Sequence, residues 1–257
     1  MANMNTGSYQ FEALNDAHFQ TQRLQQQALA VRGMETSILR GAGIQPTHDV
    51  LEIGSGPGFV SDLLAELAPE GSLHAVEPSP TLIAQLEGNV RQKPARGLFA
   101  HQAYGDALPL ADQSIDFSYT RFVLQHVPQP QAVVQEVFRV TRPGGRFCAV
   151  DSDDGLVLFH PEDPRVDHVL RSAQSIQASQ GGDRFIGRKM QEMMLAFSES
   201  ALADADVLLY VTDVIENPEK NIDFLEKVKK MKIPVLLLIN KIDQSDPKKL
   251  GDIVEKW

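Results

Sequence analysis

The chain has 257 residues, of which 42% are hydrophobic and 23% charged, a composition that fits one large α/β domain or two smaller ones. Its formal net charge of −10 argues against nucleic acid and anionic membranes as partners, because an acidic surface repels both. The single cysteine, Cys148, excludes an intramolecular disulfide and a cysteine-based zinc site, and we expect no bound metal. No apolar run reaches the roughly 20 residues of a membrane span. The start MANMNTGSYQ lacks a signal-peptide pattern, so we expect a cytoplasmic protein.

Spaced apolar positions over residues 9–40 predict one or two amphipathic helices, broken near Gly33. Short apolar runs predict strands at 50–53, 73–76, 115–119 and 147–150, and helical stretches separate them. Further helices are expected around 166–179 and 187–196. Alternating strands and helices predict an α/β fold with a doubly wound, Rossmann-like, mainly parallel sheet and helices on both faces.

The basic residues change type near residue 197. Residues 1–197 contain thirteen Arg and two Lys, whereas residues 198–257 contain nine Lys and no Arg. We interpret this break as a fusion of segments from two sources, which defines two parts, 1–197 and 198–257. The alternative is a single protein whose Lys-rich stretch at 219–232 is a solvated helix.

The second part repeats the strand and helix pattern. We expect strands at 207–211 and 235–239 and helices at 219–231 and 247–256. Two parallel strands bury too little surface to be stable alone. We therefore expect residues 198–257 to dock on the strand at 147–150 and to extend one continuous sheet.

A glycine-rich segment, VLEIGSGPGFV at 50–60, follows the first predicted strand and precedes a helix at 60–67. Gly54, Gly56 and Gly58 alternate there, and glycine permits both a tight turn and close approach of a ligand to the backbone. The Gly-x-Gly-x-Gly spacing, with Glu52 before it, differs from the dinucleotide-binding fingerprint. It resembles the first motif of class I S-adenosylmethionine (SAM)-dependent methyltransferases. The resemblance extends over residues 1–197, with residues 1–45 in the position of a helical cap.

The resemblance assigns further residues to the cofactor. Glu77, in HAVEPSP, stands where the family accepts hydrogen bonds from both ribose hydroxyls, and Asp106 stands where it contacts the adenine amino group. A surface carboxylate is the alternative for each. The cofactor-binding residues implied are Glu52, Gly54, Ser55, Gly56, Gly58, Glu77, Pro78, Asp106, Ala107 and Arg121.

Methyl transfer from a sulfonium needs mainly proximity and alignment, so few catalytic side chains are expected. His126 is the candidate general base, and a purely structural loop residue is the alternative. Tyr9, Asn15 and His18 of the cap are candidates for the acceptor pocket. The expected reaction uses SAM, yields S-adenosylhomocysteine and methylates a small molecule that the sequence does not identify; the oligomeric state also stays open.

The second part resembles Era-like GTPases. Asn240, Lys241 and Asp243 match the Asn-Lys-x-Asp motif, whose Asp binds guanine. The sequence lacks Gly-x-x-x-x-Gly-Lys-Ser/Thr, so GTP binding is not expected. Three hypotheses follow: a methyltransferase, an engineered methyltransferase/GTPase chimera that binds SAM without turnover, and a guanine nucleotide-binding module.

Overall fold

The structure is a computed structural model, and it describes residues 7–9, 11, 16–91, 93–156, 160, 163–201, 208–213 and 235–240, with backbone alone from residue 195 onward. The chain forms two compact units, Met1–Phe197 and Ser198–Trp257. None of the described helices is long and apolar enough to cross a membrane.

The first unit is built on a five-stranded sheet with the order β3-β2-β1-β4-β5. Its strands are β1 (Val50–Ile53), β2 (Leu73–Val76), β3 (Leu98–His101), β4 (Ile115–Arg121) and β5 (Thr141–Val150). All four neighbouring pairs are parallel, and Val50 of β1 lies between Leu73 of β2 and Phe117 of β4. The order reverses between β1 and β4. In such sheets, ligands bind beyond the carboxyl ends of the strands at the reversal.

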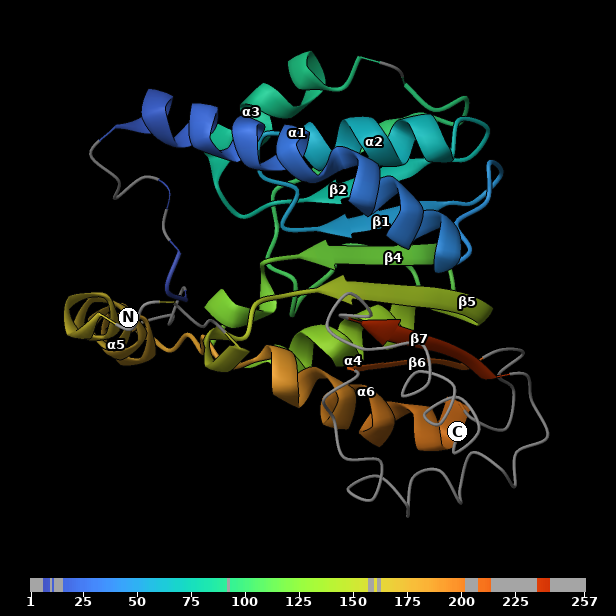
Figure 1. Ribbon diagram of the computed structural model, residues 1–257. Helices are drawn as coiled ribbons and strands as arrows, with labels where there is room; N and C mark the ends of the chain where they lie inside the picture. The colour runs from blue at the N-terminus through green and yellow to red at the C-terminus, as the bar shows by residue number, and fades with distance from the viewer. Residues whose placement is uncertain are drawn as a thin grey trace, which may run out of the picture. The chain divides into compact units, whose positions relative to one another are not determined.

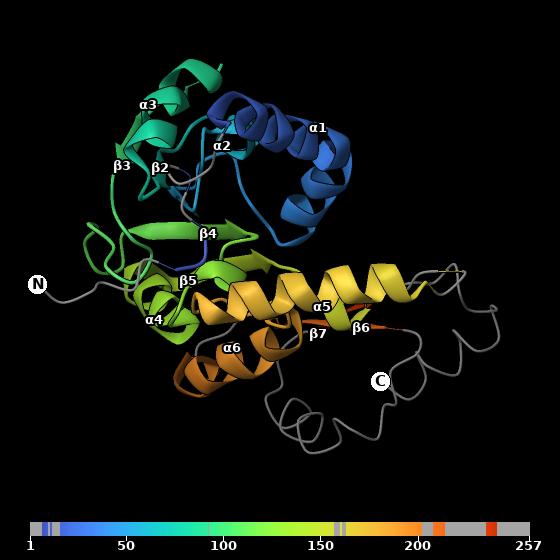
Figure 2. The same ribbon diagram turned by 90° about the vertical axis from the view of Figure 1, so that its left-hand side faces the viewer.

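Helices cover both faces of this sheet (Figures 1 and 2). They are α1 (Ala17–Gly41), α2 (Phe59–Leu67), α3 (Pro80–Asn89), α4 (Pro130–Val140), α5 (Pro164–Ser179) and α6 (Gly187–Ala201), with short turns η2 (Leu124–His126) and η3 (Asp154–Leu156). Alternate residues of β1 point to opposite faces, as the strand period requires. Val50 joins the core under α1, α2 and α3, whereas Leu51 joins the core under α4 and α6. The doubly wound fold predicted from the sequence is thus present.

Two elements of the first unit differ from expectation. Helix α1 continues through Gly33, because that glycine lies on an exposed face and buried residues such as Leu39 hold the helix on either side. Strand β3 was not expected. Its four residues are half-buried or exposed at the edge of the sheet, so they carry little of the apolar pattern that marks the central strands.

In the second unit, β6 (Leu208–Asp213) and β7 (Val235–Asn240) pair in parallel, with Leu208 opposite Val235. Both strands were expected. They form a two-stranded sheet of their own. The docking of residues 198–257 on the strand at 147–150, as one continuous sheet, stays a prediction. The helices expected at 219–231 and 247–256 lie outside the described residues.

Candidate functional site

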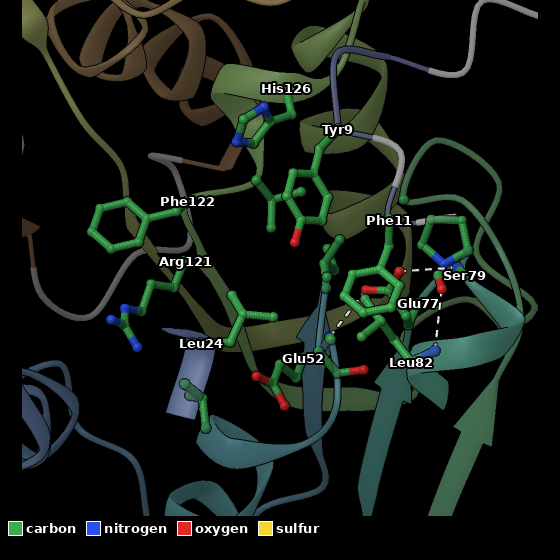
Figure 3. A pocket seen from close by; sticks show the side chains of 18 of the residues that line it. Tyr9, Phe11, Leu24, Glu52, Glu77, Ser79, Leu82, Arg121, Phe122 and His126 are labelled. Atoms are coloured by element: carbon green, nitrogen blue, oxygen red, sulfur yellow. Dashed lines mark hydrogen bonds between the residues drawn. The ribbon is translucent and has the colours of Figure 1, made fainter. Parts of the chain in front are cut away.

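A cavity of about 950 Å³ opens at the carboxyl ends of β1, β2 and β4. Its lining comes from the glycine loop after β1, from the residues after β2 and β4, from α1, and from the segment around Tyr9 and Phe11 (Figure 3). The volume lies near the top of the range of about 300–1,000 Å³ for small-molecule sites. The cavity therefore has room for a large cofactor or for two ligands.

The glycine loop forms one wall. Gly54, Gly56 and Gly58 all have positive φ, at 70°, 53° and 88°, which is the left-handed region that favours glycine. A Cβ at Gly54 would lie 2.3 Å from a Val123 methyl, so packing also requires glycine there. A Cβ at Gly56 would meet nothing within 4 Å. The backbone at Gly56 therefore borders open space that a ligand can enter.

Glu77 follows β2 and is fixed by backbone donors. Its Oε2 accepts a hydrogen bond from the Gly56 N–H at 3.0 Å, and its Oε1 accepts one from the Ser79 N–H at 3.0 Å. The residue is 7% exposed. These two bonds fix the orientation of the Glu77 carboxylate beside the glycine loop.

Glu52 in β1 lies in a different environment. It is 3% exposed and accepts a short hydrogen bond from the Ser61 hydroxyl of α2. Burial raises the pKa of Glu52 to about 8, against the opposing effect of the Ser61 bond. With this pKa the Glu52 carboxyl is largely protonated near neutral pH. A cationic ligand would favour its ionised form.

The end of β4 is anchored to α1 through a buried carboxylate. Glu35, 3% exposed, accepts a hydrogen bond from the Tyr119 hydroxyl at 2.5 Å and lies 3.4 Å from Arg121 Nη1. Arg121 stacks over Phe122, 5.0 Å from the ring centre. Phe122 has φ +55°, a rare conformation for a side chain of this size, and such strain is often found at functional sites.

His126 lies at the part of the cavity beside Tyr9 (Figure 3). Its Nδ1 is 2.9 Å from the Ser8 hydroxyl, and its carbonyl oxygen accepts from the Ser8 N–H at 2.9 Å. The Tyr9 and His126 rings are 5.3 Å apart. Burial lowers the pKa of His126 to about 4, and the charges of Arg184 and Arg23 act in the same direction. The imidazole is therefore neutral at pH 7.

The structure brings most of the predicted site residues together. Those that line the cavity are Glu52, Gly54, Ser55, Gly56, Glu77, Pro78, Arg121, His126 and Tyr9. Gly58 is buried as the N-cap of α2, where it packs on Leu86. Asp106, Ala107 and His18 are exposed and are not part of the lining. The roles predicted for Asp106 and Ala107 at the adenine stay predictions.

Four predicted positions lie outside the described residues or in the second unit. Asn15, Lys241 and Asp243 lie outside the described residues. Asn240 is the last residue of β7 in the second unit, where the structure gives the backbone only.

Sequence reasoning missed several lining residues, among them Phe11, Arg23, Leu82, Tyr104 and Arg184. They come from five separate parts of the chain and belong to no motif. Tyr104 and Gly105, which precede Asp106 directly, belong to the lining. The distant arginines carry no local signal, because only the fold brings them to the cavity.

Comparisons with known proteins agree on one protein class. Residues 51–149 match the family model described as a methyltransferase domain. An arsenite methyltransferase of Halobacterium salinarum is 33% identical over 127 residues, 49% of this chain and 32% of that protein. An uncharacterized methyltransferase of Schizosaccharomyces pombe is 30% identical over 139 residues, 52% of this chain and 50% of that protein. The chain thus spans half or less of the length of these relatives.

The fold is also found among solved structures. The crystal structure of a candidate methyltransferase from Bacillus halodurans superposes with a TM-score of 0.50 and 17% identity, over 64% of this chain and 66% of that one. At this identity the likeness concerns the fold alone.

Proposed function

We propose that the chain is a class I SAM-dependent methyltransferase that transfers the methyl group of SAM to a small-molecule acceptor; the match of residues 51–149 to the methyltransferase domain model supports this. The observation that carries the proposal is the cavity at the reversal of strand order, bordered by the glycine loop and by the fixed carboxylate of Glu77. This is where a doubly wound sheet binds its ligand.

The residues present fit SAM. The Ser55 hydroxyl is buried at the cavity and has no hydrogen-bond partner among the described residues, as expected for a group that meets a ligand. Glu77 suits the two ribose hydroxyls because its oriented carboxylate is acceptor-only. Glu52 supplies negative charge for the ammonium group of the cofactor.

The protein residues mainly orient and enclose the reactants. When bound, SAM supplies a methyl group that is already activated on a sulfonium. Phe11, Leu24 and Ala28 give the cavity an apolar wall from the N-terminal segment and α1, which excludes water. Neutral His126 can accept the proton that an acceptor hydroxyl or amine loses, if the acceptor needs a base.

Calorimetric titration with S-adenosylhomocysteine tests the proposal. We expect one-to-one binding, and we expect Glu77→Ala to weaken it by about 1.5–3 kcal/mol, the range for hydrogen bonds to a charged group. Glu87→Ala, on the exposed surface of α3, is the matched control and should bind normally. Failure of the wild-type protein to bind, or equal affinities for all three proteins, would refute the site.

We further propose that residues 198–257 come from a different source, a fragment of an Era-like GTPase. The change from Arg to Lys supports this, as does the boundary between the compact units at Phe197 and Ser198, which falls within the stretch 190–219 that has no Lys or Arg. Such a fusion can retain SAM binding without turnover. Incubation with radiolabelled SAM and panels of small acids, phenols and amines separates the two cases: label transfer indicates an enzyme, and S-adenosylhomocysteine binding without transfer to any panel favours the inactive hybrid.

A further inference from the structure

Charge is distributed unevenly along the cavity. Its acidic lining residues are Glu52 and Glu77, both beside the glycine loop, whereas its basic lining residues are Arg23, Arg121 and Arg184. Figure 3 shows His126 and Tyr9 apart from the two carboxylates. Arg23 and Arg184 line the same cavity as His126, and their charges lower its pKa. The cavity thus carries three basic lining residues in a chain of net charge −10.

The arginines differ in their partners. Arg121 pairs with Glu35, and Arg184 pairs with the buried Asp154, to which its Nη2 donates at 3.2 Å. Arg23 instead donates to two neutral amides of its own helix, through Nε to Gln20 at 2.9 Å and through Nη1 to Gln27 at 3.3 Å. No carboxylate in the described part of the chain forms an ion pair with Arg23.

Apolar side chains also line the cavity. Tyr9 and Phe122 contribute aromatic rings and Val127 an aliphatic side chain, whereas the ring of Phe11 lies beside Glu77 (Figure 3). A half-enclosed guanidinium without a counterion favours an anion, and Arg matches the planar geometry of a carboxylate. The apolar walls favour a ligand with an aromatic or similarly hydrophobic body.

We propose that the acceptor is a small carboxylic acid with an apolar body, and that Arg23 binds its carboxylate beside His126. That the bound acid is a methyl acceptor rests on the proposed methyltransferase function, whereas the anion site at Arg23 is independent of it. In one form of the reaction, a carboxylate oxygen forms the new bond to the methyl carbon, the bond from that carbon to sulfur breaks with its electrons going to sulfur, and no proton is released. In the other, the carboxylate only anchors the acceptor, a hydroxyl or amine is methylated, and its proton passes to His126.

The probes that test the anion site are benzoate and its neutral analogue benzamide. Each is titrated calorimetrically into the full chain, with and without saturating S-adenosylhomocysteine. We expect benzoate to bind about tenfold or more tightly than benzamide, and Arg23→Gln to remove that preference. Arg23→Lys should retain part of it. Arg165→Gln, which removes an exposed arginine paired with Asp163 on α5, should leave it intact.

Equal binding of the two probes, no benzoate binding, or an unchanged preference in Arg23→Gln would overturn the proposal. Arg23 is only half-buried on α1, so its variants should fold, and thermal unfolding verifies this. The proposed function is tested separately, because it is refuted if S-adenosylhomocysteine does not bind. In that case the benzoate titration without S-adenosylhomocysteine still tests the anion site. Methylated products distinguish the two forms of reaction, because a methyl ester releases methanol in base and an ether or amine does not.

Discussion

Two carboxylates of the same cavity lie in different surroundings. Glu77 accepts hydrogen bonds from two backbone N–H groups, which fix its orientation. Glu52 is buried in β1, where desolvation outweighs the bond from Ser61 and favours the protonated form. A ligand with an ammonium group must therefore displace a proton from Glu52, and its binding should release that proton to the solvent.

Glu52 should make the stability of the ligand-free protein depend on pH. Its pKa is about 8 when folded and near 4.5 when unfolded, so the stabilising contribution is complete below pH 4.5 and is lost as the pH rises to 8. Relative to Glu52→Gln, the wild-type free energy of unfolding should fall by about 4 kcal/mol between pH 5 and 8. Urea unfolding at both pH values measures this. Parallel pH profiles of the two proteins would contradict it.

His126 should produce the opposite slope. Its folded pKa of about 4 lies below the value of 6.5 for a free histidine, so the folded state binds fewer protons between these values. The contribution of neutral His126 to stability is complete above pH 6.5 and is lost as the pH falls towards 4. Between pH 7.5 and 5, the wild-type protein should lose about 2 kcal/mol more than His126→Gln. Replacing the exposed His168 on α5 should leave the wild-type slope unchanged.

The predicted residues that line the cavity share a local signal, and the lining residues that were not predicted lack one. Gly54, Gly56 and Glu77 follow strands whose ends can be located from the sequence, so their convergence at one edge follows from parallel topology. Arg23 and Arg184 are 161 residues apart and line the same cavity only because the fold brings α1 and the segment before α6 to it. No spacing rule links them.

At the scale of elements, α1 is fastened to β4 by Glu35. Glu35→Ala should leave the Tyr119 hydroxyl and the Arg121 guanidinium without their buried partner and cost roughly 3 kcal/mol of unfolding free energy. Chemical denaturation measures the loss. Glu35→Gln keeps an acceptor for Tyr119 and should lose less.

The control for this prediction is a surface contact of the same helix. Glu66 of α2 accepts from Arg32 of α1, but its side chain is 56% exposed. Glu66→Ala should therefore change stability by only about 0–1 kcal/mol. An equal loss from both alanine variants would mean that burial does not set the strength of the α1 contact.

Buried elements were predicted better than edge elements for a physical reason. Strands β1 and β2 begin and end where the apolar runs do, because most of their residues face a core. Strand β3 exposes Phe99 and Ala100 at the sheet edge, so its sequence lacks the apolar run that predicts a strand. Its pairing with β2 holds it in the sheet. In α1, long-range contacts of Glu35 and Leu39 outweigh the helix-breaking tendency of Gly33, about 1 kcal/mol.

At the scale of the whole molecule, the change in basic residues and the division into compact units fall in the same region. Residues 190–219 contain no Lys or Arg, and the units divide between Phe197 and Ser198. The expectation of one continuous sheet, which stays a prediction, assumes that two strands need a larger partner sheet. The apolar pattern of β6 and β7 identifies them as strands, yet it contains no information on which neighbour each will take.

The division into units predicts the behaviour of a shortened chain. All cavity-lining residues and both described core clusters lie at or before Met193, and α6 ends at Ala201. A chain that ends at Ala201 should therefore fold cooperatively and bind S-adenosylhomocysteine with the affinity of the full protein. Thermal unfolding and calorimetry measure both properties. A shortened chain that is insoluble, or that melts without a cooperative transition, would show that residues 202–257 stabilise the first unit, and the whole chain would then be a single folding unit despite its two compact parts.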